Sequence, residues 1–429
     1  QLAYYAPMND MAAPVHQSRA REIAIVGGNR TPAKGTRIVT GRGLVRVEDI
    51  KTGDEIVLMP DRTPRSGRWR QKPRKIQTVV ETYHSEHPVP IYRLTTKRGY
   101  QLFGNAIHPV WICESSSSGW HGGREPERHG RFETLKSIRP NQYAALRFHG
   151  SFPTTGIINA DDAYFLGLMT GDGYWAGSYG KMSFTSNDAD EELFSWLEQY
   201  LTRSGIRWAR SHKRQANGTT IGWCSLPFKH LVESWEVICA KGKDKEIPEC
   251  IWTGTEDVVA AFIRGVADTD GCATTKPSVV IVGISERLLR GLHLLLLRWG
   301  IVASLHGYPA QPHWKRPMPS WRLEVAGKNL LRYRDQIGFL LTRKRDRLPS
   351  GIASQNRTNW DRIVSCEIIG QDIVYGFTVE PDHRYYGDGF LNHNSGKTET
   401  ALVELIIRAT GHIPMALMAT YPKEKLAPP

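Results

Sequence analysis

The chain of 429 residues is long enough for two or three domains, and a hydrophobic content of 40 % with 13 Trp is ample for buried cores. It contains neither a signal peptide nor an apolar run of about 18 residues, which argues against secretion and membrane insertion. The formal net charge of +13 makes a polyanion, usually DNA or RNA, a natural partner.

The six cysteines show no Cys-x-x-Cys pair and no His/Cys cluster at zinc spacing. This pattern is typical of free thiols in a reducing compartment. We therefore expect a cytoplasmic protein, inside its host cell and without membrane contact.

The first predicted element is an apolar strand over residues 23–26, followed at once by a Gly-rich turn at 27–30. Near the other end, residues 395–398 precede a helical pattern over residues 399–408. Joined, the two turns read G-G-N-R-S-G-K-T, a complete G-x-x-x-x-G-K-T phosphate-binding loop (P-loop). Apart, neither half can hold a nucleotide. The residues expected to bind nucleotide in the joined loop are Gly27, Gly28, Asn29, Arg30, Ser395, Gly396, Lys397 and Thr398.

We therefore interpret the 364 residues from 31 to 394 as an insertion into the active site of another protein. The fragments 1–30 and 395–429 are too short to fold alone. They resemble parts of a phage terminase large subunit, a DNA-packaging ATPase, which implies a phage or prophage gene. Because the loop is interrupted, we expect no ATP hydrolysis by the intact chain.

Short strands and turns rich in Gly and Asp are predicted just inside the left edge of the insertion. Together with three later segments they resemble the splicing blocks of an intein, an element that excises itself and joins its flanks. The segments are residues 33–57, 105–110, 373–386 and 389–395. Their most specific part is His393-Asn394-Ser395, where the P-loop resumes. The resemblance implies an all-β, horseshoe-like Hint splicing domain and includes His383 among the catalytic residues.

The chemistry of splicing suits these residues. The side-chain amide of Asn394 can attack its own backbone carbonyl and cut the chain, and His393 can act as general acid or base, worth about 10²–10⁴-fold in rate. Ser395 supplies a hydroxyl that can accept an acyl group. His108 would protonate or orient the upstream scissile amide, while Asn105 polarises its carbonyl. No cofactor is expected for splicing.

Two positions depart from the intein pattern. The usual first residue is Cys, but this chain has Thr31, a poorer nucleophile, and Gly376 stands where an Asp is frequent. Thr31 is consistent with an introduced substitution that traps the precursor, or with direct attack of Ser395 on the Arg30–Thr31 bond. A third explanation makes Cys366 an internal nucleophile; the alternative is a half-buried strand thiol. We expect the first acyl shift to be blocked, slow or altered.

The middle of the insertion contains an internal repeat. Residues 165–173 recur in outline at 263–271, and each nonapeptide ends a helical pattern with an acidic residue before a Gly. Gly167 and Gly265 would let the two helix backbones pack closely. This contact would place the two acidic ends side by side near a pseudo-twofold axis.

The acids at these ends, Asp172 and Asp270, can hold Mg²⁺ against scissile phosphates. The repeat resembles the LAGLIDADG homing endonucleases, which cut long DNA sites, and it implies an α+β pseudo-twofold domain. Thr170 replaces the other usual acid of the first motif. Lys181 and Lys245 are candidates for electrostatic help in cleavage, although each also fits a solvated basic loop.

Runs of β type with basic and aromatic residues follow each motif, at 181–185, 208–214 and 305–321. They are expected to contact phosphates and bases of double-stranded DNA. We expect a monomer with internal pseudo-twofold symmetry.

The predicted organisation is thus a multidomain chain in which a splicing domain is interrupted by an endonuclease domain. Two alternatives remain: a plain DNA-binding protein without autocatalysis, and a P-loop ATPase with a large, non-splicing regulatory DNA-binding insertion. The predicted boundaries are 1–30 and 395–429 for the flanks, 31–155 and 357–394 for the splicing domain, and 156–356 for the endonuclease domain.

Overall fold

The computed structural model describes residues 31–58, 64–65, 68–69, 75–114, 130–146, 156–176, 180–213, 217–235, 237, 242–310, 317–351 and 360–393. Asn394, Ser395, the other predicted nucleotide-binding residues and both flanking fragments lie outside this description. The predicted boundary after residue 155 adjoins the undescribed segment 147–155, and the boundary after residue 356 falls within 352–359.

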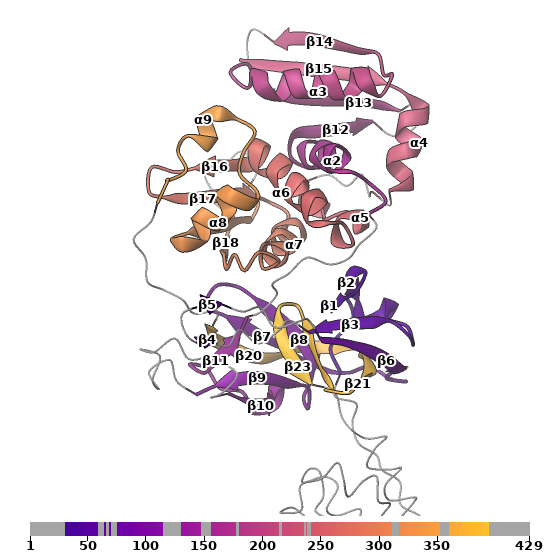
Figure 1. Ribbon diagram of the computed structural model, residues 1–429, viewed down its shortest axis with the longest axis vertical. Coiled ribbons are helices and arrows are strands. Elements are labelled where there is room, and N and C mark those ends of the chain that lie inside the picture. Colours follow the sequence, from indigo (N-terminus) through magenta and orange to yellow (C-terminus); the bar gives the residue numbers. More distant parts are fainter. Residues whose placement is uncertain are drawn as a thin grey trace, which may run out of the picture.

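The chain forms a β-rich part and an α/β part, drawn below and above in Figure 1. The β-rich part is assembled from both ends of the described chain. Its main strands are β1 (Arg37–Thr40), β2 (Gly43–Arg46), β3 (Glu55–Leu58), β6 (Lys75–His84), β7 (Val89–Thr96), β8 (Gln101–Asn105), β9 (Pro109–Cys113), β10 (Arg131–Thr134), β11 (Tyr143–Ala145), β20 (Trp360–Asp372), β21 (Tyr375–Glu380), β22 (Arg384–Gly387) and β23 (Phe390–His393).

These strands join in one antiparallel sheet of 13 strands, in the order β21-β6-β3-β1-β22-β23-β9-β11-β20-β7-β8, with β2 on β1 and β10 on β9. The last described strands therefore lie among the first described ones: β22 pairs with β1, and β23 pairs with β9. One apolar cluster of the sheet contains Ile38, Ile56, Val79 and Phe377, all fully buried. Burial of such aliphatic and aromatic side chains is the main favourable term in holding the ends of the domain together.

The remaining short elements of the β-rich part are the two-stranded ribbon β4 (Pro64–Arg65) and β5 (Arg68–Trp69), and the 3₁₀ turns η2 (Val47–Asp49) and η5 (Leu135–Ser137).

The α/β part contains two modules of the same topology. The first has α2 (Ala160–Asp172), β12 (Gly173–Ala176), β13 (Lys181–Asn187), α3 (Glu191–Arg203), β14 (Trp208–Lys213), β15 (Gly218–Cys224) and α4 (Leu226–Ser234). The second has α6 (Glu256–Asp270), β16 (Gly271–Ala273), β17 (Ser278–Gly283), α7 (Glu286–Leu296), β18 (Ser304–Tyr308), β19 (Ser320–Ala326), α8 (Lys328–Gln336) and α9 (Thr342–Arg345). The turn η6 (Gly242–Asp244) and helix α5 (Glu249–Trp252) connect the modules.

The two sheets have equivalent strand orders, β12-β13-β15-β14 and β16-β17-β19-β18. The repeat predicted from two nonapeptides thus extends to the whole α/β part. Each motif helix begins with a side-chain cap: Asn159 accepts from the amide of Asp162 at 2.9 Å, and Thr255 accepts from that of Val258 at 3.5 Å. Each helix ends at the predicted acid, where Gly starts the next strand.

Helices α2 and α6 cross where the prediction placed the contact, at Gly167 and Gly265. A Cβ on Gly167 would lie 2.4 Å from the carbonyl oxygen of Phe262 and 2.9 Å from Cα of Gly265. A Cβ on Gly265 would lie 2.6 Å from the carbonyl oxygen of Tyr164. Only glycine allows two backbones to approach this closely, so the predicted close packing of the two helices is confirmed.

The two parts are packed against each other. Gly99 approaches the backbone of Leu305 so closely that a Cβ would lie 2.3 Å from its carbonyl oxygen. Arg37 of β1 makes a bidentate ion pair with Glu249 of α5, at 2.5 and 2.8 Å, and lies 4.4 Å from the ring centre of Trp252. Arg37 is buried and Glu249 is partly exposed, so removal of Glu249 would leave a buried charge without this partner at the interface.

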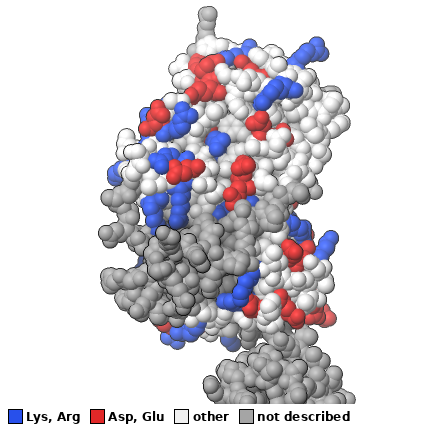
Figure 2. All heavy atoms as spheres, in the orientation of Figure 1, with Lys and Arg blue, Asp and Glu red and all other residues white. Residues whose placement is uncertain are grey.

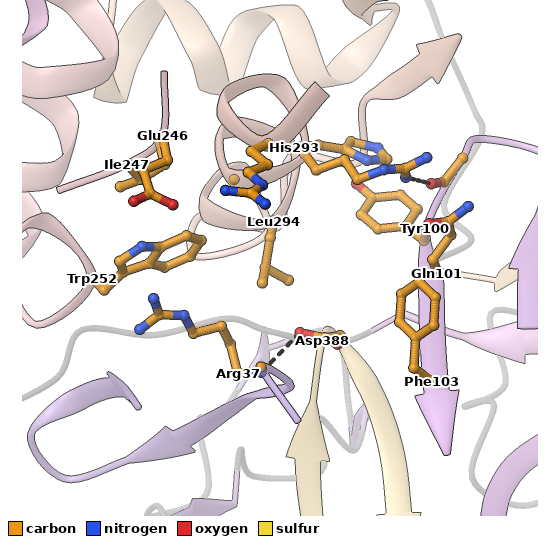
Figure 3. A pocket seen from close by; sticks show the side chains of 15 residues that line it. Arg37, Tyr100, Gln101, Phe103, Glu246, Ile247, Trp252, His293, Leu294 and Asp388 are labelled. Atoms are coloured by element: carbon orange, nitrogen blue, oxygen red, sulfur yellow. Dashed lines mark hydrogen bonds between the residues drawn. The ribbon is translucent and has the colours of Figure 1, made fainter. Parts of the chain in front are cut away.

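A cavity of about 270 Å³ lies along the same boundary (Figure 3). Arg37 and Asp388 reach it from the β-rich part, and Trp252 and His293 from the α/β part. None of the site residues predicted from the sequence lines it. Among the described helices, none is long and apolar enough to span a membrane.

Candidate splicing and carboxylate sites

Thr31 is fully buried and is held by Asn105 at the end of β8. The backbone N–H of Asn105 donates to the carbonyl oxygen of Thr31 at 3.2 Å, and its side-chain N–H donates to Oγ1 of Thr31 at 3.3 Å. Asn105 therefore contacts Thr31, the first residue of the predicted insertion. The Arg30 carbonyl, the predicted target, lies outside the described residues.

His108 belongs to the turn that follows β8. Its backbone N–H donates to the carbonyl oxygen of Asn105 at 3.0 Å, and its ring Nε2 lies 3.0 Å from Oδ1 of Asn392. Both side chains are fully buried. One turn, residues 105–108, therefore contacts the first residue of the predicted insertion and its last strand, β23.

His393 ends β23, immediately before Asn394. Its ring packs edge-on against Phe132 with 5.0 Å between ring centres, and lies 6.2 Å from the ring of His383. His383 occupies the turn between β21 and β22 with φ of 52°. The structure therefore brings the two predicted histidines together at the end of the last strand.

Gly376 on β21 lies beside Thr31. A Cβ at this position would meet Cε2 of Tyr83 at 2.3 Å and Cγ2 of Thr31 at 2.5 Å. The two departures from the intein pattern are therefore neighbours, because the methyl group of Thr31 and the ring of Tyr83 occupy the space that an Asp side chain would need.

Cys366 lies on β20, and its thiol donates to the carbonyl oxygen of Leu135 at 3.2 Å. Burial, and secondarily the charge of Glu367, raises the pKa of this thiol to about 12. A nucleophilic cysteine needs a lowered pKa. These features favour the half-buried strand thiol over an internal nucleophile.

Asp172 and Asp270 stand at the ends of the crossing helices α2 and α6. Burial, together with the charge of Asp172, raises the pKa of Asp270 to about 6. The pKa of Asp172 is also raised, mainly because nearby protein atoms displace water from its carboxylate. The residue as a whole is nevertheless exposed to solvent. The two carboxylates are thus close enough to repel each other, as expected of a site for a divalent cation.

Two lysines approach these helix ends. Nζ of Lys245 donates to the carbonyl oxygen of Gly171 at 2.6 Å, next to Asp172. Nζ of Lys344 is buried and donates to the carbonyl oxygens of Ala267 and Asp268, at 3.0 and 2.6 Å. The charges of both lysines lower the pKa of each carboxylate.

Lys181, the other lysine considered from the sequence, is exposed at the start of β13. No described contact joins it to the carboxylates, so the solvated interpretation fits it better.

Sequence reasoning missed Asn392 and Lys344. A signal for Lys344 existed: it follows Asp270 by 74 residues, and Lys245 follows Asp172 by 73. Extending the repeat beyond the two nonapeptides would have found it. No pattern marked Asn392, whose contact with His108 arises because β23 pairs with the strand after His108.

Within the predicted DNA-contacting runs, Arg210 forms ion pairs with glutamates of the same module. Arg210 on β14 donates to Glu191 at 2.6 and 2.9 Å and to Glu198 at 3.4 Å, and its guanidinium stacks over Phe194. On the face in Figure 2, Lys and Arg alternate with Asp and Glu over the described α/β part. This face carries mixed charge rather than one basic stripe.

Comparison with known proteins places the second module in a family. Residues 257–338, from α6 to the loop after α8, match the model of the LAGLIDADG-like domain. Among solved structures, a mesophilic variant of the homing endonuclease I-DmoI is 15 % identical, with a TM-score of 0.33, covering 42 % of this chain and 94 % of that chain. A mutant of the Ssp DnaB mini-intein M86 is 9 % identical, with a TM-score of 0.27, covering 85 % and 98 %. At these scores neither structure bears on the fold.

Three curated relatives have unrelated names. The replicative DNA helicase DnaB of Rhodothermus marinus is 24 % identical over 61 % of this chain and 27 % of that protein. A DNA polymerase of Thermococcus litoralis is 26 % identical over 54 % and 14 %, and a probable translation initiation factor IF-2 of Methanocaldococcus jannaschii is 25 % identical over 50 % and 18 %. The chain thus spans less than a third of the length of each.

A β-rich part built from both ends of the described chain is interrupted by two modules of the same topology, the second of which matches the LAGLIDADG-like domain. This is the architecture of an intein that carries a homing endonuclease domain. The chain is an element of this kind, and the predicted fold class is confirmed. The terminase host remains a prediction.

Proposed function

We propose that the chain excises its own central segment by protein splicing and that the embedded domain cleaves double-stranded DNA. The observation that carries the splicing proposal is the turn at 105–108. It binds Thr31 through Asn105 and β23 through His108. Residues far apart in sequence thus meet at one place, as ligation of the two flanks requires.

In the proposed reaction, Oγ1 of Thr31 attacks the carbonyl carbon of Arg30, and an ester replaces the amide. Ser395 then takes the acyl group from Thr31 through its own hydroxyl. Asn394 cyclises onto its backbone carbonyl and releases the segment, with His393 exchanging protons. The ester at Ser395 finally rearranges to an amide, restoring the P-loop. Each step exchanges one acyl bond for another.

Thr31 makes the first step slow in this proposal. A hydroxyl is a poorer nucleophile than a thiol near neutral pH, since a thiol is partly ionised there. The Cβ branch adds crowding, because Cγ2 of Thr31 already occupies the space beside Gly376. We therefore propose that cleavage after Asn394 outpaces transfer at Arg30.

For the embedded domain, the carboxylate oxygens of Asp172 and Asp270 are the hard donors that Mg²⁺ prefers, and Mg²⁺ commonly uses one or two carboxylates together with substrate phosphates. Among the described residues, no group of three or more His, Cys, Asp or Glu gathers as a closed metal site. An open pair fits an ion shared with DNA. Bound there, the ion would polarise a scissile phosphate, and Lys245 and Lys344 would offset negative charge.

The relatives support the interpretation of the central segment as an insertion. A helicase, a polymerase and an initiation factor share no activity by name, and each matches this chain over only 14–27 % of its length. A common segment within unrelated proteins is what a mobile insertion would produce. By the same logic, the flanks need not come from any of these hosts.

The test is intact mass spectrometry of the purified chain and of Thr31→Cys during hours of incubation. We expect the ligated flanks and the free 364-residue segment from Thr31→Cys, and slower products from the parent. Asn394→Ala in the Thr31→Cys background should stop release of the segment. A Thr31→Cys chain that keeps its full mass would contradict splicing and favour the ATPase with a non-splicing insertion, which should also bind ATP intact.

A further inference from the structure

The side chain of Asn392 has its amide oriented by the backbone around it. Nδ2 donates to the carbonyl oxygen of Phe390 at 2.9 Å and faces that of Gly387 at 3.5 Å. Carbonyl oxygens only accept hydrogen bonds, so the amino group must point toward them. Oδ1 consequently faces His108, whose Nε2 lies 3.0 Å away.

This orientation decides the proton position on the imidazole ring. Oδ1 of a neutral amide is an acceptor only, so the partner nitrogen Nε2 of His108 must carry a hydrogen. In a neutral imidazole the other nitrogen, Nδ1, then has the lone pair. Both side chains are fully buried, where the loss of a hydrogen bond costs more than in water.

We propose that Asn392 is a positioning residue for the first acyl shift, because it holds His108 in the tautomer with hydrogen on Nε2. The inference rests on the proposed splicing function. Proton exchange at the first junction is then assigned to Nδ1: it takes the hydrogen from Oγ1 of Thr31 as the new C–O bond forms. It returns this hydrogen to the nitrogen of Thr31 as the C–N bond breaks, so no net proton is consumed.

The contact between Asn392 and His108 also connects the two proposed splice junctions. Asn392 is two residues before Asn394 on the strand that leads to the second junction, and it pairs with Val110 of β9. A shift of β23 would therefore misplace His108 at the first junction as well as His393 at the second. The rings of His393 and His383 also lie at this end of the sheet, so the assay has to report on His108 itself.

The test is NMR of the full chain labelled with ¹⁵N in histidine, with the His108 signals assigned by loss in His108→Gln. The parent should show hydrogen on Nε2 and none on Nδ1 in the neutral ring. Asn392→Leu removes the acceptor and should give a mixture of tautomers, whereas Asn392→Asp keeps an acceptor and should retain the parent tautomer. A parent ring with hydrogen on Nδ1, or an unchanged tautomer in Asn392→Leu, would overturn the proposal.

The rate of cleavage at the first junction, measured with hydroxylamine in the Thr31→Cys background, is the second readout. Asn392→Leu should slow it at least about tenfold, within the range that a general acid–base contributes, and Asn392→Asp should recover much of the loss. Gln77→Leu is the matched control. Gln77 is a buried amide with hydrogen bonds of 2.8 Å to the backbone of Arg384 and Asp382.

The control should lose stability without altering the His108 tautomer. If the control changes the tautomer as much as Asn392→Leu does, the effect is general loosening and the proposal is wrong. If the parent and Thr31→Cys show no cleavage, splicing fails as the function, while the NMR result still decides whether Asn392 sets the tautomer of His108.

Discussion

Replacing Asp270 by Asn should abolish DNA cleavage and, in the absence of metal, raise the stability of the endonuclease domain. Burial and the charge of Asp172 raise the pKa of Asp270 from 3.8 to about 6. Each pKa unit corresponds to about 1.4 kcal/mol, so the ionised carboxylate costs the native state about 3 kcal/mol at most. Because the side chain is partly exposed, solvent screening reduces this to roughly 2 kcal/mol. Asn is isosteric and carries no charge.

The sign of the pH dependence follows from this shift. With its folded pKa above its unfolded value, Asp270 destabilises the native state when ionised. The advantage of Asp270→Asn should thus be complete well above pH 6. It should decline as the pH falls through 6 and vanish near pH 4, where the carboxyl is protonated in both states.

The assay is thermal unfolding in EDTA at pH 8 and pH 4.5. We expect a rise in melting temperature of about 4–8 °C at pH 8, and much less at pH 4.5. Mg²⁺ should stabilise the parent and leave Asp270→Asn unchanged, since the ion offsets the repulsion only when both carboxylates remain. Asp335→Asn, an exposed acid on α8, is the control and should have little effect. An Asp270→Asn chain that melts no higher than the parent at pH 8 would refute the reasoning.

Three further predictions concern glycine and lysine positions. Gly265→Ala places a Cβ 2.6 Å from the backbone of the partner helix and should destabilise the domain by about 1–3 kcal/mol in urea unfolding, whereas Gly222→Ala, with no atom nearer than 4.0 Å, should not. Gly376→Ala should slow cleavage by hydroxylamine at the first junction about tenfold or more while cleavage after Asn394 persists; equal slowing at both junctions would argue against a local effect. Lys344→Met removes a charge that lowers the pKa of Asp270, so DNA cleavage should require a higher pH; an unchanged pH profile would exclude this role.

Much of the architecture could be predicted from the sequence because it is encoded in local patterns. The helices ending at Asp172 and Asp270 carry capping residues before them and a Gly after them, and their glycines sit where the backbones cross. The resemblance of the two edges to splicing blocks anticipated the β-rich part. These features can be predicted from the sequence because helix propensity, capping and glycine contacts depend on a few neighbouring residues.

Other features depend on contacts between distant segments, which only the tertiary structure brings together. Sheet pairing places Asn392 against His108, 284 positions away. It also places Gly376 beside Thr31, and thereby connects two departures from the family pattern that the sequence presents as separate. Packing of α9 against the end of α6 buries Lys344 near Asp270. Residue types and local order were thus determined by the sequence. The contact partners and the pKa shifts were decided by the fold, since these depend on burial and on neighbours distant along the chain.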